Sequence, residues 1–292
     1  MKILMTGSSG FIGKHISKIN VSNIRHVLRR GKAVNTNEKA DVFYIDSMEN
    51  CADWSVAFDG IGVIIHLCGL AHSNKLSAQE YNKINVDCTL SLAEQAAHHG
   101  VKRFVFVSSA NVGLVENAQS KSKYMAEVGL KKIAEKTGIE VVIVRPTLVY
   151  GANAPGNFGL LTKLVVKLPV LPFGLTDNKR DFIAVQNLAD LLLTCANHPK
   201  ASGQIFLASD GESVSIMEFT NAIAEGFGKT IVQAPVPLSL MRFSAWMVGK
   251  SHLIEQLLGD LQVDSSSTYD VLGWKPPYTM KQAMASLIEN TK

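Results

Sequence analysis

Residues 2–13, KILMTGSSGFIG, begin the chain with a short apolar strand, a glycine-rich turn and the start of an amphipathic helix. In this setting Gly7 permits the tight turn, Gly10 lets the backbone approach a pyrophosphate, and Gly13 lets the helix pack closely on the strand. The helix would present unpaired N–H groups and the positive end of its dipole to the phosphates. The stretch predicts a dinucleotide site whose contacts are Thr6, Gly7, Gly10, Phe11, Ile12 and Gly13.

Length and composition agree with a globular protein. The 292 residues are 47% hydrophobic, enough to bury a core in one large domain or in a main domain with a smaller partner. No apolar run approaches bilayer length, and the strand and glycine turn stand where a signal peptide would have its apolar core. The net charge of +4 includes no dense basic block, which argues against nucleic acid as a partner. We expect a cytoplasmic protein with no stable membrane insertion.

The four cysteines are Cys51, Cys68, Cys88 and Cys195, and they lack the paired spacing of a metal site or a disulfide framework. We therefore expect no metal, and we expect reduced, partly buried thiols. This pattern agrees with a cytoplasmic location.

Apolar strand runs alternate with helical patterns along the first half, as in a parallel sheet covered by helices on both faces. After the first strand, further strands are expected at Ile24–Leu28, Val42–Ile45, Val63–Leu67, Arg103–Val107, Val141–Val144 and Gln204–Ala208. Helices are expected at Ser77–His99 and Ser120–Thr137, because Gly100 and Gly138 would cap their C-termini.

Beyond residue 150 the pattern loosens into segments punctuated by Pro and Gly. The fold class predicted is α/β, a doubly wound parallel sheet of the Rossmann type with a smaller, interleaved C-terminal unit that binds the substrate. Residues 1–150 would form the sheet domain, with residues 178–212 returning to it. Residues 151–177 and 213–292 would form the smaller unit.

The stretch Leu238–Leu258 is rich in large apolar residues, including Met241, Phe243, Trp246 and Met247. Aromatic residues at helical spacing usually face a core, so we expect a packed helix here rather than a membrane anchor.

Seven landmarks fall in one order along the chain. They are Thr6–Gly13, His66–Gly69, Asn85-Val86, Val107–Ala110, Ser122–Glu127, Arg145–Gly151 and Arg180–Val185. In this order they resemble the extended short-chain dehydrogenase/reductase family, in particular its NAD-dependent epimerase/dehydratase branch acting on nucleotide sugars. The resemblance continues through Leu272–Pro276 and so covers nearly the whole chain. Within the branch, the chain looks most like enzymes that make or reduce UDP-linked N-acetyl deoxy-sugars for bacterial surface polysaccharides.

The resemblance implies a catalytic Ser or Thr, a Tyr, and a Lys four residues after the Tyr. In the family the Tyr is the acid/base, the Lys lowers its pKa and binds the nicotinamide ribose, and the Ser hydrogen-bonds the substrate oxygen. By motif register, Ser109 is the serine, Lys123 is the lysine, and Gln119 occupies the tyrosine position.

Gln119 is the main departure from the family pattern. The chain between Ser109 and Lys123 is shorter than in relatives by roughly fifteen residues, a stretch that usually carries the tyrosine and a substrate-facing loop. Glutamine forms hydrogen bonds but does not titrate. Tyr124 should point about 100° away from Lys123 on a helix. Tyr81 and Tyr150 could approach the pocket, although simple packing of all three tyrosines is the favoured interpretation.

Cofactor choice depends on the end of the second strand, where NAD sites place an acid and NADP sites place arginines. Here Arg29 and Arg30 follow the strand and no acid is present, which favours NADP over NAD, although such a pair can also be ordinary surface charge. By resemblance Asp46 lies near the adenine. The landmark after the fourth strand adds three further cofactor contacts, Leu67, Cys68 and Gly69.

The segment Asn157-Phe158, in the loop after Gly151, resembles the family segment that binds a nucleotide diphosphate, and Arg180 matches a phosphate-binding arginine. An ion pair of Arg180 with Asp181 or Asp190 is an equal alternative. A second family arginine before Gly-Asp is missing in Leu257–Asp260. We expect a UDP-sugar to bind at the carboxyl edge of the sheet.

Two classes of function stay open. One is an NAD(P)-dependent oxidoreductase or epimerase acting on a UDP-sugar, favoured by Ser109 and Lys123. The other is a non-catalytic NAD(P)-binding sensor or scaffold of the same fold, favoured by Gln119. Pairing of two copies through two helices is common in the family, so a homodimer is one assembly that the resemblance implies.

Overall fold

The computed structural model describes residues 1–19, 23–31, 40–47, 53–70 and 76–289. Its contacts divide the chain into two compact units. The first comprises Met1–Thr147, Leu188–Ala208 and Ser265–Lys275, and the second comprises Leu148–Asn187, Ser209–Asp264 and Pro276–Lys292. The division differs from our prediction in four places: residues 148–150, 178–187 and 209–212, expected in the sheet domain, lie in the second unit, and residues 265–275, expected in the smaller unit, lie in the first.

A parallel sheet of seven strands forms the centre of the first unit, in the order β3-β2-β1-β4-β5-β6-β10. The strands are β1 (Lys2–Thr6), β2 (Ile24–Arg29), β3 (Asp41–Ile45), β4 (Ile61–His66), β5 (Arg103–Val107), β6 (Glu140–Pro146) and β10 (Ile205–Ala208). Each lies within two residues of its predicted bounds. The Rossmann-type α/β fold class is confirmed.

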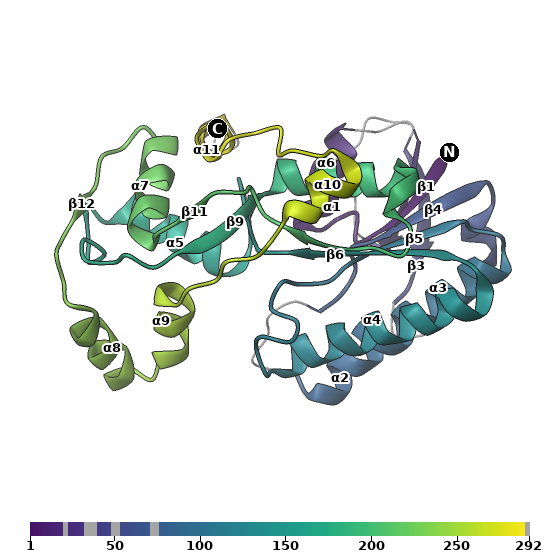
Figure 1. The fold of residues 1–292 in the computed structure, drawn as a ribbon, viewed down its shortest axis with the longest axis horizontal. Helices are drawn as coiled ribbons and strands as arrows, with labels where there is room; N and C mark the ends of the chain where they lie inside the picture. Colours follow the sequence, from purple (N-terminus) through teal and green to yellow (C-terminus); the bar gives the residue numbers. More distant parts are fainter. Residues whose placement is uncertain (20–22, 32–39, 48–52, 71–75, 290–292) are drawn as a thin grey trace. The chain divides into compact units, whose positions relative to one another are not determined.

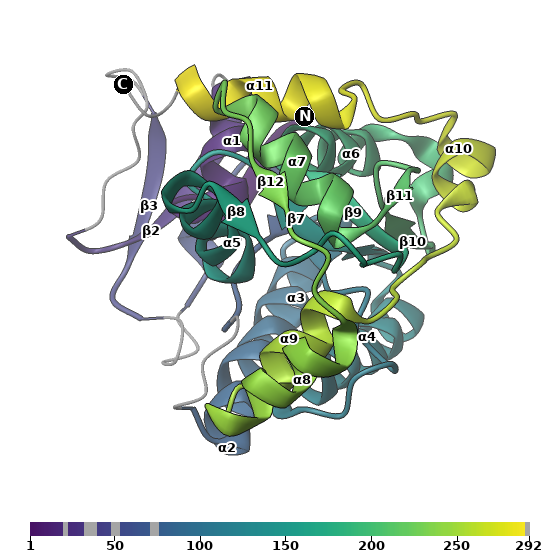
Figure 2. The ribbon, with the colours of Figure 1, turned by 90° about the vertical axis from the view of Figure 1, so that its left-hand side faces the viewer.

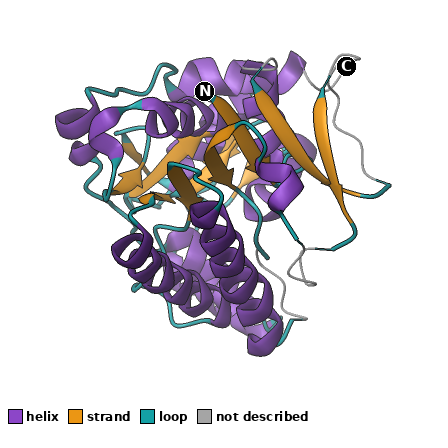
Figure 3. Ribbon diagram, turned by 90° about the vertical axis from the view of Figure 1, so that its right-hand side faces the viewer, coloured by secondary structure: helices purple, strands orange, loops and turns teal. Residues whose placement is uncertain are grey.

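Helices cover both faces of this sheet (Figures 1 and 3). On one face lie α3 (Cys88–His98) and α4 (Ala118–Thr137), and on the other lie α1 (Phe11–Ile19) and α6 (Val185–Asn197). The central strands β4 and β5 are largely apolar because both faces of the sheet are covered there; all five residues of β5 are buried. The core on the α3–α4 side includes Leu4, Ile64, Phe104, Phe106, Leu92, Ala96, Ala126 and Leu130.

The helix predicted at Ser77–His99 is interrupted. It begins as α2 (Ala78–Asn82) behind a Ser77–Glu80 capping box, passes through a π-helical turn at Lys83–Asp87, and continues as α3. π-Turns are frequent at functional sites. The second predicted helix, α4, begins at Ala118 with Asn117 as its N-cap and ends at Gly138, whose φ of 79° makes it the expected left-handed cap.

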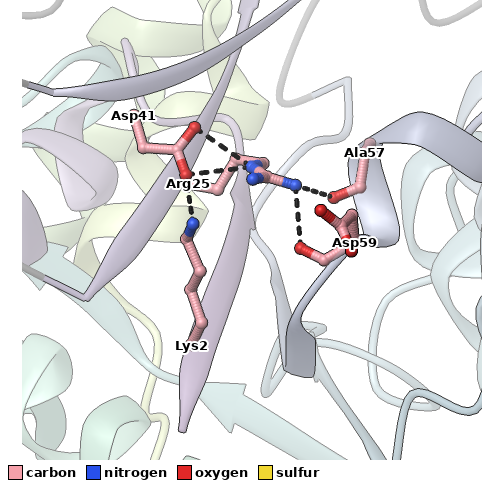
Figure 4. A network of polar contacts seen from close by, with 5 residues as sticks. All are labelled: Lys2, Arg25, Asp41, Ala57 and Asp59. Atoms are coloured by element: carbon pink, nitrogen blue, oxygen red, sulfur yellow. Dashed lines mark hydrogen bonds and ion pairs between the residues drawn. The ribbon is translucent and has the colours of Figure 1, made fainter.

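A polar network fastens the amino ends of the first three strands, at the edge opposite the glycine turn (Figure 4). Asp41 accepts hydrogen bonds from Arg25 Nε at 3.0 Å and pairs with Lys2. The Arg25 guanidinium also donates to the carbonyls of Ala57 at 2.9 Å and Asp59 at 3.1 Å. The network therefore joins β1, β2 and β3 to the turn before β4.

The second unit contains two small sheets and five helices among its described residues (Figure 2). The sheets are β11-β9-β7, from Ser213–Val214, Arg180–Ala184 and Leu148–Tyr150, and β12-β8, from Val232–Gln233 and Val170–Leu171. The helices are α5 (Gly156–Lys167), α7 (Ile216–Gly226), α8 (Leu238–Met247), α9 (Ser251–Leu258) and α11 (Met280–Glu289). Phe182 stacks on Phe219 with ring centroids 3.8 Å apart, at the centre of an aromatic core with Tyr150 and Phe158. The remaining helix, α10 (Ser266–Leu272), belongs to the first unit.

Our prediction of one packed helix over Leu238–Leu258 is wrong. Gly249, with φ of +66°, ends α8, and the chain continues as α9. Of the four large side chains singled out, only Met241 is buried, whereas Phe243, Trp246 and Met247 are exposed. Phe243, Trp246 and Met247 share one side of α8, and no described residue buries that side.

Among the described residues, Cys68, Cys88 and Cys195 are not in disulfide bonds, and the last two are buried; Cys51 lies outside the described residues. Within the described ranges, no three or more His, Cys, Asp and Glu side chains are grouped as a metal ion would require. In the same part of the chain, no helix has the length and apolar character needed to cross a membrane.

Candidate active site

The glycine turn between β1 and α1 has the shape that a pyrophosphate site requires. Gly7 adopts φ of +75°, and the Gly10 N–H donates to the Gly7 carbonyl at 2.9 Å. A methyl group at Gly13 would lie 2.5 Å from the Gly7 oxygen, so only glycine lets α1 start this close to the turn. The first-turn N–H groups of Phe11 and Ile12 have no carbonyl partner within the helix. The residues present therefore fit a dinucleotide phosphate.

A buried polar chain braces the loop that follows β4. His66 Nδ1 and Thr6 Oγ1 are hydrogen-bonded at 2.8 Å, and His66 Nε2 and Thr89 Oγ1 at 3.1 Å. Thr6 Oγ1 also accepts from the Cys68 N–H at 3.4 Å. Burial, together with the nearby Lys123 charge, lowers the pKa of His66 to about 3, so the ring is neutral. From the sequence, His66 was only part of a motif; the structure gives it a positioning role.

Lys123 projects from α4 into the interior of the first unit. Its Nζ donates to the Val107 carbonyl at 2.9 Å and lies 4.7 Å from the centroid of the Phe106 ring. A methyl group at Gly69 would lie only 2.9 Å from this nitrogen. Burial lowers the pKa of Lys123 to about 8, although the neighbouring Cys68 and Glu127 act to raise it. The cation is thus held at the carboxyl ends of β4 and β5.

Asn85, in the π-helical turn, joins the loop after β4 to α4. Its Oδ1 accepts from the Leu70 N–H at 2.7 Å, and its Nδ2 donates to Ser122 Oγ at 2.9 Å. Ser122 in turn donates to the Gln119 carbonyl at 2.8 Å. Asn85 is fully buried, so this link sets the distance between Gly69 and the first turns of α4.

Glu127 connects three of the sequence landmarks. This carboxylate is buried and accepts hydrogen bonds from Ser108 Oγ and from Arg145 Nε, the latter at 2.9 Å, while a second nitrogen of Arg145 completes the ion pair. Hydrogen bonding to Glu127 raises the pKa of Arg145. Glu127 lies one helical turn after Lys123, and Ser108 directly precedes Ser109. The cluster therefore positions both predicted catalytic residues, a role that was missed because its members are far apart in sequence.

Ser109 and Gln119 have the places that the motif register gave them. Ser109, directly after β5, is half-buried, and its Oγ accepts from the Asn111 N–H at 3.2 Å. Gln119 is half-buried and is the second residue of α4. It precedes Lys123 by four residues, so both side chains leave the same face of the helix.

The tyrosines do not supply an evident replacement. Tyr124 is 54% exposed, so the expectation that it packs is wrong, and its position next to Lys123 turns it away from the buried amine. Tyr81 and Tyr150 are buried, as expected. Tyr150 lies in the second unit and donates to Asp210 Oδ2 at 2.7 Å. Burial and this carboxylate raise the pKa of Tyr150 well above its usual range, which makes it a poor acid/base.

Arg29, the last residue of β2, and Arg30, the next residue, differ in their surroundings. Arg30 Nε donates to Asp46 Oδ1 at 2.7 Å in an exposed ion pair. Arg29 is also exposed, but it has no carboxylate partner among the described residues. Its charge acts to lower the pKa of Cys68, although burial, the larger effect, raises it. Of the two arginines, Arg29 is therefore the one whose charge acts on the loop after β4 without a carboxylate partner in the described part of the chain.

The predicted substrate residues all lie in the second unit. Asn157 is in the first turn of α5, where we had expected a loop; it is exposed and donates to Gln256 Oε1 at 3.2 Å. Phe158 is buried in the aromatic core, so only its backbone could reach a ligand.

Arg180 is half-buried and donates to the Gly259 carbonyl. Burial lowers its pKa, against the opposing effect of Asp260. The alternative ion pairs are not formed, since Asp181 accepts from Ser213 and the Val263 N–H and Asp190 accepts from Trp274. A guanidinium has five N–H donors, and within the described ranges the acceptor of Arg180 is the Gly259 carbonyl.

A family model described as the NAD dependent epimerase/dehydratase family matches residues 3–208. The chain belongs to this family of enzymes. It is 37% identical to a UDP-glucose 4-epimerase of Vibrio cholerae, over 96% of this chain and 92% of that protein.

Solved structures share the fold. A UDP-N-acetylglucosamine 4-epimerase from Bacillus cereus superposes with a TM-score of 0.79 at 16% identity, covering 100% of both chains. A Bordetella bronchiseptica enzyme in complex with NAD and UDP superposes with a TM-score of 0.73 at 19% identity, over 99% of this chain and 94% of that chain.

Proposed function

We propose that this family member is an NAD(P)-dependent epimerase or oxidoreductase acting on a UDP-linked sugar of the N-acetylhexosamine type, in surface polysaccharide biosynthesis. The observation that carries the proposal is the buried Lys123 amine, which donates to the Val107 carbonyl and packs against Gly69 on the same unit as the glycine turn. The Vibrio cholerae and Bacillus cereus proteins, both named as UDP-sugar 4-epimerases, support the same class of substrate. A homodimer in the cytoplasm is our expectation for its assembly.

A nicotinamide cofactor, when bound, supplies the hydride acceptor and donor. The glycine turn would hold its pyrophosphate, and Lys123 would bind its ribose. At the sugar, oxidation of a carbinol removes a hydride from the carbon and a proton from the hydroxyl; return of the hydride to the opposite face of the carbon, with a proton to the oxygen, inverts the carbon. The Ser109 hydroxyl would hydrogen-bond the sugar oxygen, and the nearby ammonium would stabilise negative charge on it.

For the cofactor we propose NADP(H) rather than NAD(H), with Arg29 as the contact to the 2′-phosphate. The basis is the absence of an acid after β2 and the unpaired state of Arg29 among the described residues. The Bordetella bronchiseptica complex contains NAD, which is the alternative.

For the substrate we propose that Arg180, with Asn157 in the first turn of α5, binds the UDP diphosphate. Calorimetry with UDP tests this. Arg180→Ala should weaken UDP binding by a few kcal/mol at most, because charge-assisted hydrogen bonds are lost while water still reaches the group. NADPH affinity should hardly change. If the wild type does not bind UDP, or binds it no better than the variant does, Arg180 is not the diphosphate ligand.

The reaction itself is tested by incubating the protein with UDP-glucose or UDP-N-acetylglucosamine and NADP⁺ or NAD⁺, with proton NMR of the anomeric signals. Appearance of the C4 epimer supports the proposal. One observation, Gln119 in place of the tyrosine, favours a second candidate, a non-catalytic NAD(P)-binding sensor or scaffold. Tight cofactor binding without turnover of any UDP-sugar would select that second candidate.

A further inference from the structure

The outer side of α8 presents a continuous apolar face. Its inner side is also apolar, with Met241 buried and Leu238 and Ala245 half-buried. The outward side chains are Leu240, Phe243, Trp246 and Met247, which are 55–68% exposed. At 3.6 residues per turn these four fall within an arc of roughly 120°. A helix that is apolar on both sides is normally covered on both sides.

The turn after α8 fixes the end of this face. Gly249, with φ of +66°, donates to the Trp246 carbonyl at 3.0 Å, and the Lys250 N–H donates to the Ala245 carbonyl at 2.8 Å. This left-handed cap holds Trp246, Met247 and Val248 outward as three consecutive residues that are 66–68% exposed. The chain then returns as α9 beside α8 (Figures 1 and 2). We call Leu240, Phe243 and Trp246–Lys250 the α8–α9 tip.

The segment of chain that carries the α8–α9 tip contains basic residues and no acidic ones. No Asp or Glu occurs between Glu225 and Glu255, a stretch that contains Lys229, Arg242 and Lys250. Arg242 pairs with Glu255 at 2.8 Å, which fastens α8 to α9. Lys250 is exposed and, as far as the structure describes the chain, has no carboxylate partner. The tip therefore combines aromatic side chains with an unpaired cation.

We propose that the α8–α9 tip docks on an anionic lipid surface, with Trp246, Phe243 and Met247 at the headgroup boundary and Lys250 against the lipid charges. Trp and Phe next to Lys are the residues that favour such interfaces. A second copy of the chain is a poorer occupant. The ten-residue α8 is only about 15 Å long, and a stable dimer buries roughly 800 Å² on each partner. The binding is peripheral, and it goes beyond the enzymatic proposal without depending on it.

The chain contains its own reporter for this binding. Of its three tryptophans, Trp54 and Trp274 are 2% and 6% exposed, whereas Trp246 is 68% exposed. Fluorescence quenching by acrylamide therefore measures mainly Trp246. With phosphatidylcholine/phosphatidylglycerol vesicles we expect a blue shift, loss of quenching and co-sedimentation of the full chain. With pure phosphatidylcholine, or at high salt, we expect a weaker response because the charge attraction is removed.

Three variants test the assignment by vesicle co-sedimentation. The double variant Phe243→Ser, Met247→Ser keeps the Trp246 reporter and should lower affinity roughly tenfold or more, because two large apolar contacts are lost. Lys250→Glu should lower affinity for the anionic vesicles only. Leu160→Ser is the matched control, since Leu160 is 60% exposed on α5, and its affinity should equal that of the wild type. A thermal unfolding curve for each variant checks that the chain folds.

Three results would overturn the proposal. The first is an unchanged Trp246 spectrum on anionic vesicles. The second is an equal loss of binding in Leu160→Ser. The third is protection of Trp246 from quenching without lipid, increasing with protein concentration. In that case sedimentation velocity would show a dimer, and the double variant Phe243→Ser, Met247→Ser would not form it. This third result would assign the tip to contact between copies.

Discussion

Gly69 and the Lys123 amine are so close that a single methyl group on Gly69 would come within 2.9 Å of Nζ. The same methyl group would lie 3.1 Å from Asn85 Oδ1. Glycine at this position is thus required by the packing of the loop after β4 against a buried cation and an amide. Neither neighbour is free to move, since each has a further hydrogen-bond partner of its own.

Gly69→Ala should therefore weaken cofactor binding, because the loop or Lys123 must shift to admit the methyl group. We expect NADPH affinity to fall roughly tenfold, which corresponds to a loss of about 1.4 kcal/mol of binding free energy. Titration by nucleotide fluorescence measures it, and circular dichroism shows whether the fold persists. Unchanged affinity in a folded variant would mean that this loop does not touch the cofactor.

The lowered pKa of Lys123 predicts that cofactor affinity and folding stability depend on pH. Its pKa of about 8 means that the ammonium is present below this pH and lost above it. NADPH affinity should thus fall as pH rises through about 8, and Lys123→Met should remove this slope. Without ligand, the unfolded chain binds more protons than the folded one between about 8 and 10.5, so this lysine makes folding stability rise with pH there. A slope that persists in Lys123→Met must come from another group.

Arg29 and Arg30 form a matched pair for testing cofactor preference. Arg29→Ala should cost about 1.5–3 kcal/mol of NADPH binding, as expected for charge-assisted contacts to the 2′-phosphate. Arg30→Ala should cost less, because Arg30 already pairs with Asp46. NADH affinity should change little in both. Equal NADPH and NADH affinities in the wild type, or a preference for NADH, would reverse the assignment.

Gln119 predicts slow turnover, since a positioned acid/base typically contributes roughly 10²–10⁴-fold in rate. Gln119→Tyr should raise the epimerisation rate, because residue 119 shares a helix face with Lys123 and the buried cation would lower the phenol pKa. Tyr124→Phe is the control and should leave the rate unchanged. If the wild type turns over rapidly and loses activity in Tyr81→Phe or Tyr150→Phe, another tyrosine has taken the role.

Asp41 predicts acid sensitivity of the sheet. Partial burial acts to raise its pKa, but the hydrogen bonds from Arg25 and Lys2 together lower it below the ordinary value of 3.8. Its contribution to stability is therefore present above about 3.8 and is lost as pH falls through the folded-state value. Asp41→Asn should lower the unfolding free energy at pH 7 by about 1 kcal/mol, since the pair is partly solvent-screened. Urea unfolding measures this: the difference in unfolding free energy between the wild type and Asp41→Asn should be smaller at pH 3 than at pH 7.

The sheet could be predicted from the sequence because each strand is a short apolar run next to a glycine or a helix signal. β5, for example, was predicted with its observed bounds. Gly138, which caps the C-terminus of α4, was also predicted correctly from the sequence. These features depend on residues that are neighbours in the chain.

What could not be predicted depends on contacts between distant residues. The Ser108–Glu127–Arg145 cluster joins three segments, and no spacing rule reveals that one carboxylate serves two donors. The exposure of Trp246 was missed because periodicity identifies an apolar face but not what covers it. The alternative that Arg180 forms an ion pair with Asp181 or Asp190 was wrong, because its acceptor is the Gly259 carbonyl.

The π-helical turn at Lys83–Asp87 makes the site sensitive to chain length rather than to residue type alone. Such a turn contains one residue more than an α-helical turn. Loss of a single codon within it would restore a regular helix and rotate everything before the deletion by about 100° relative to α3. Asn85 could then no longer reach both Leu70 and Ser122. Deletion of one residue here would thus break the link that Asn85 forms between the loop after β4 and α4, although the loop and α4 would both keep their full length.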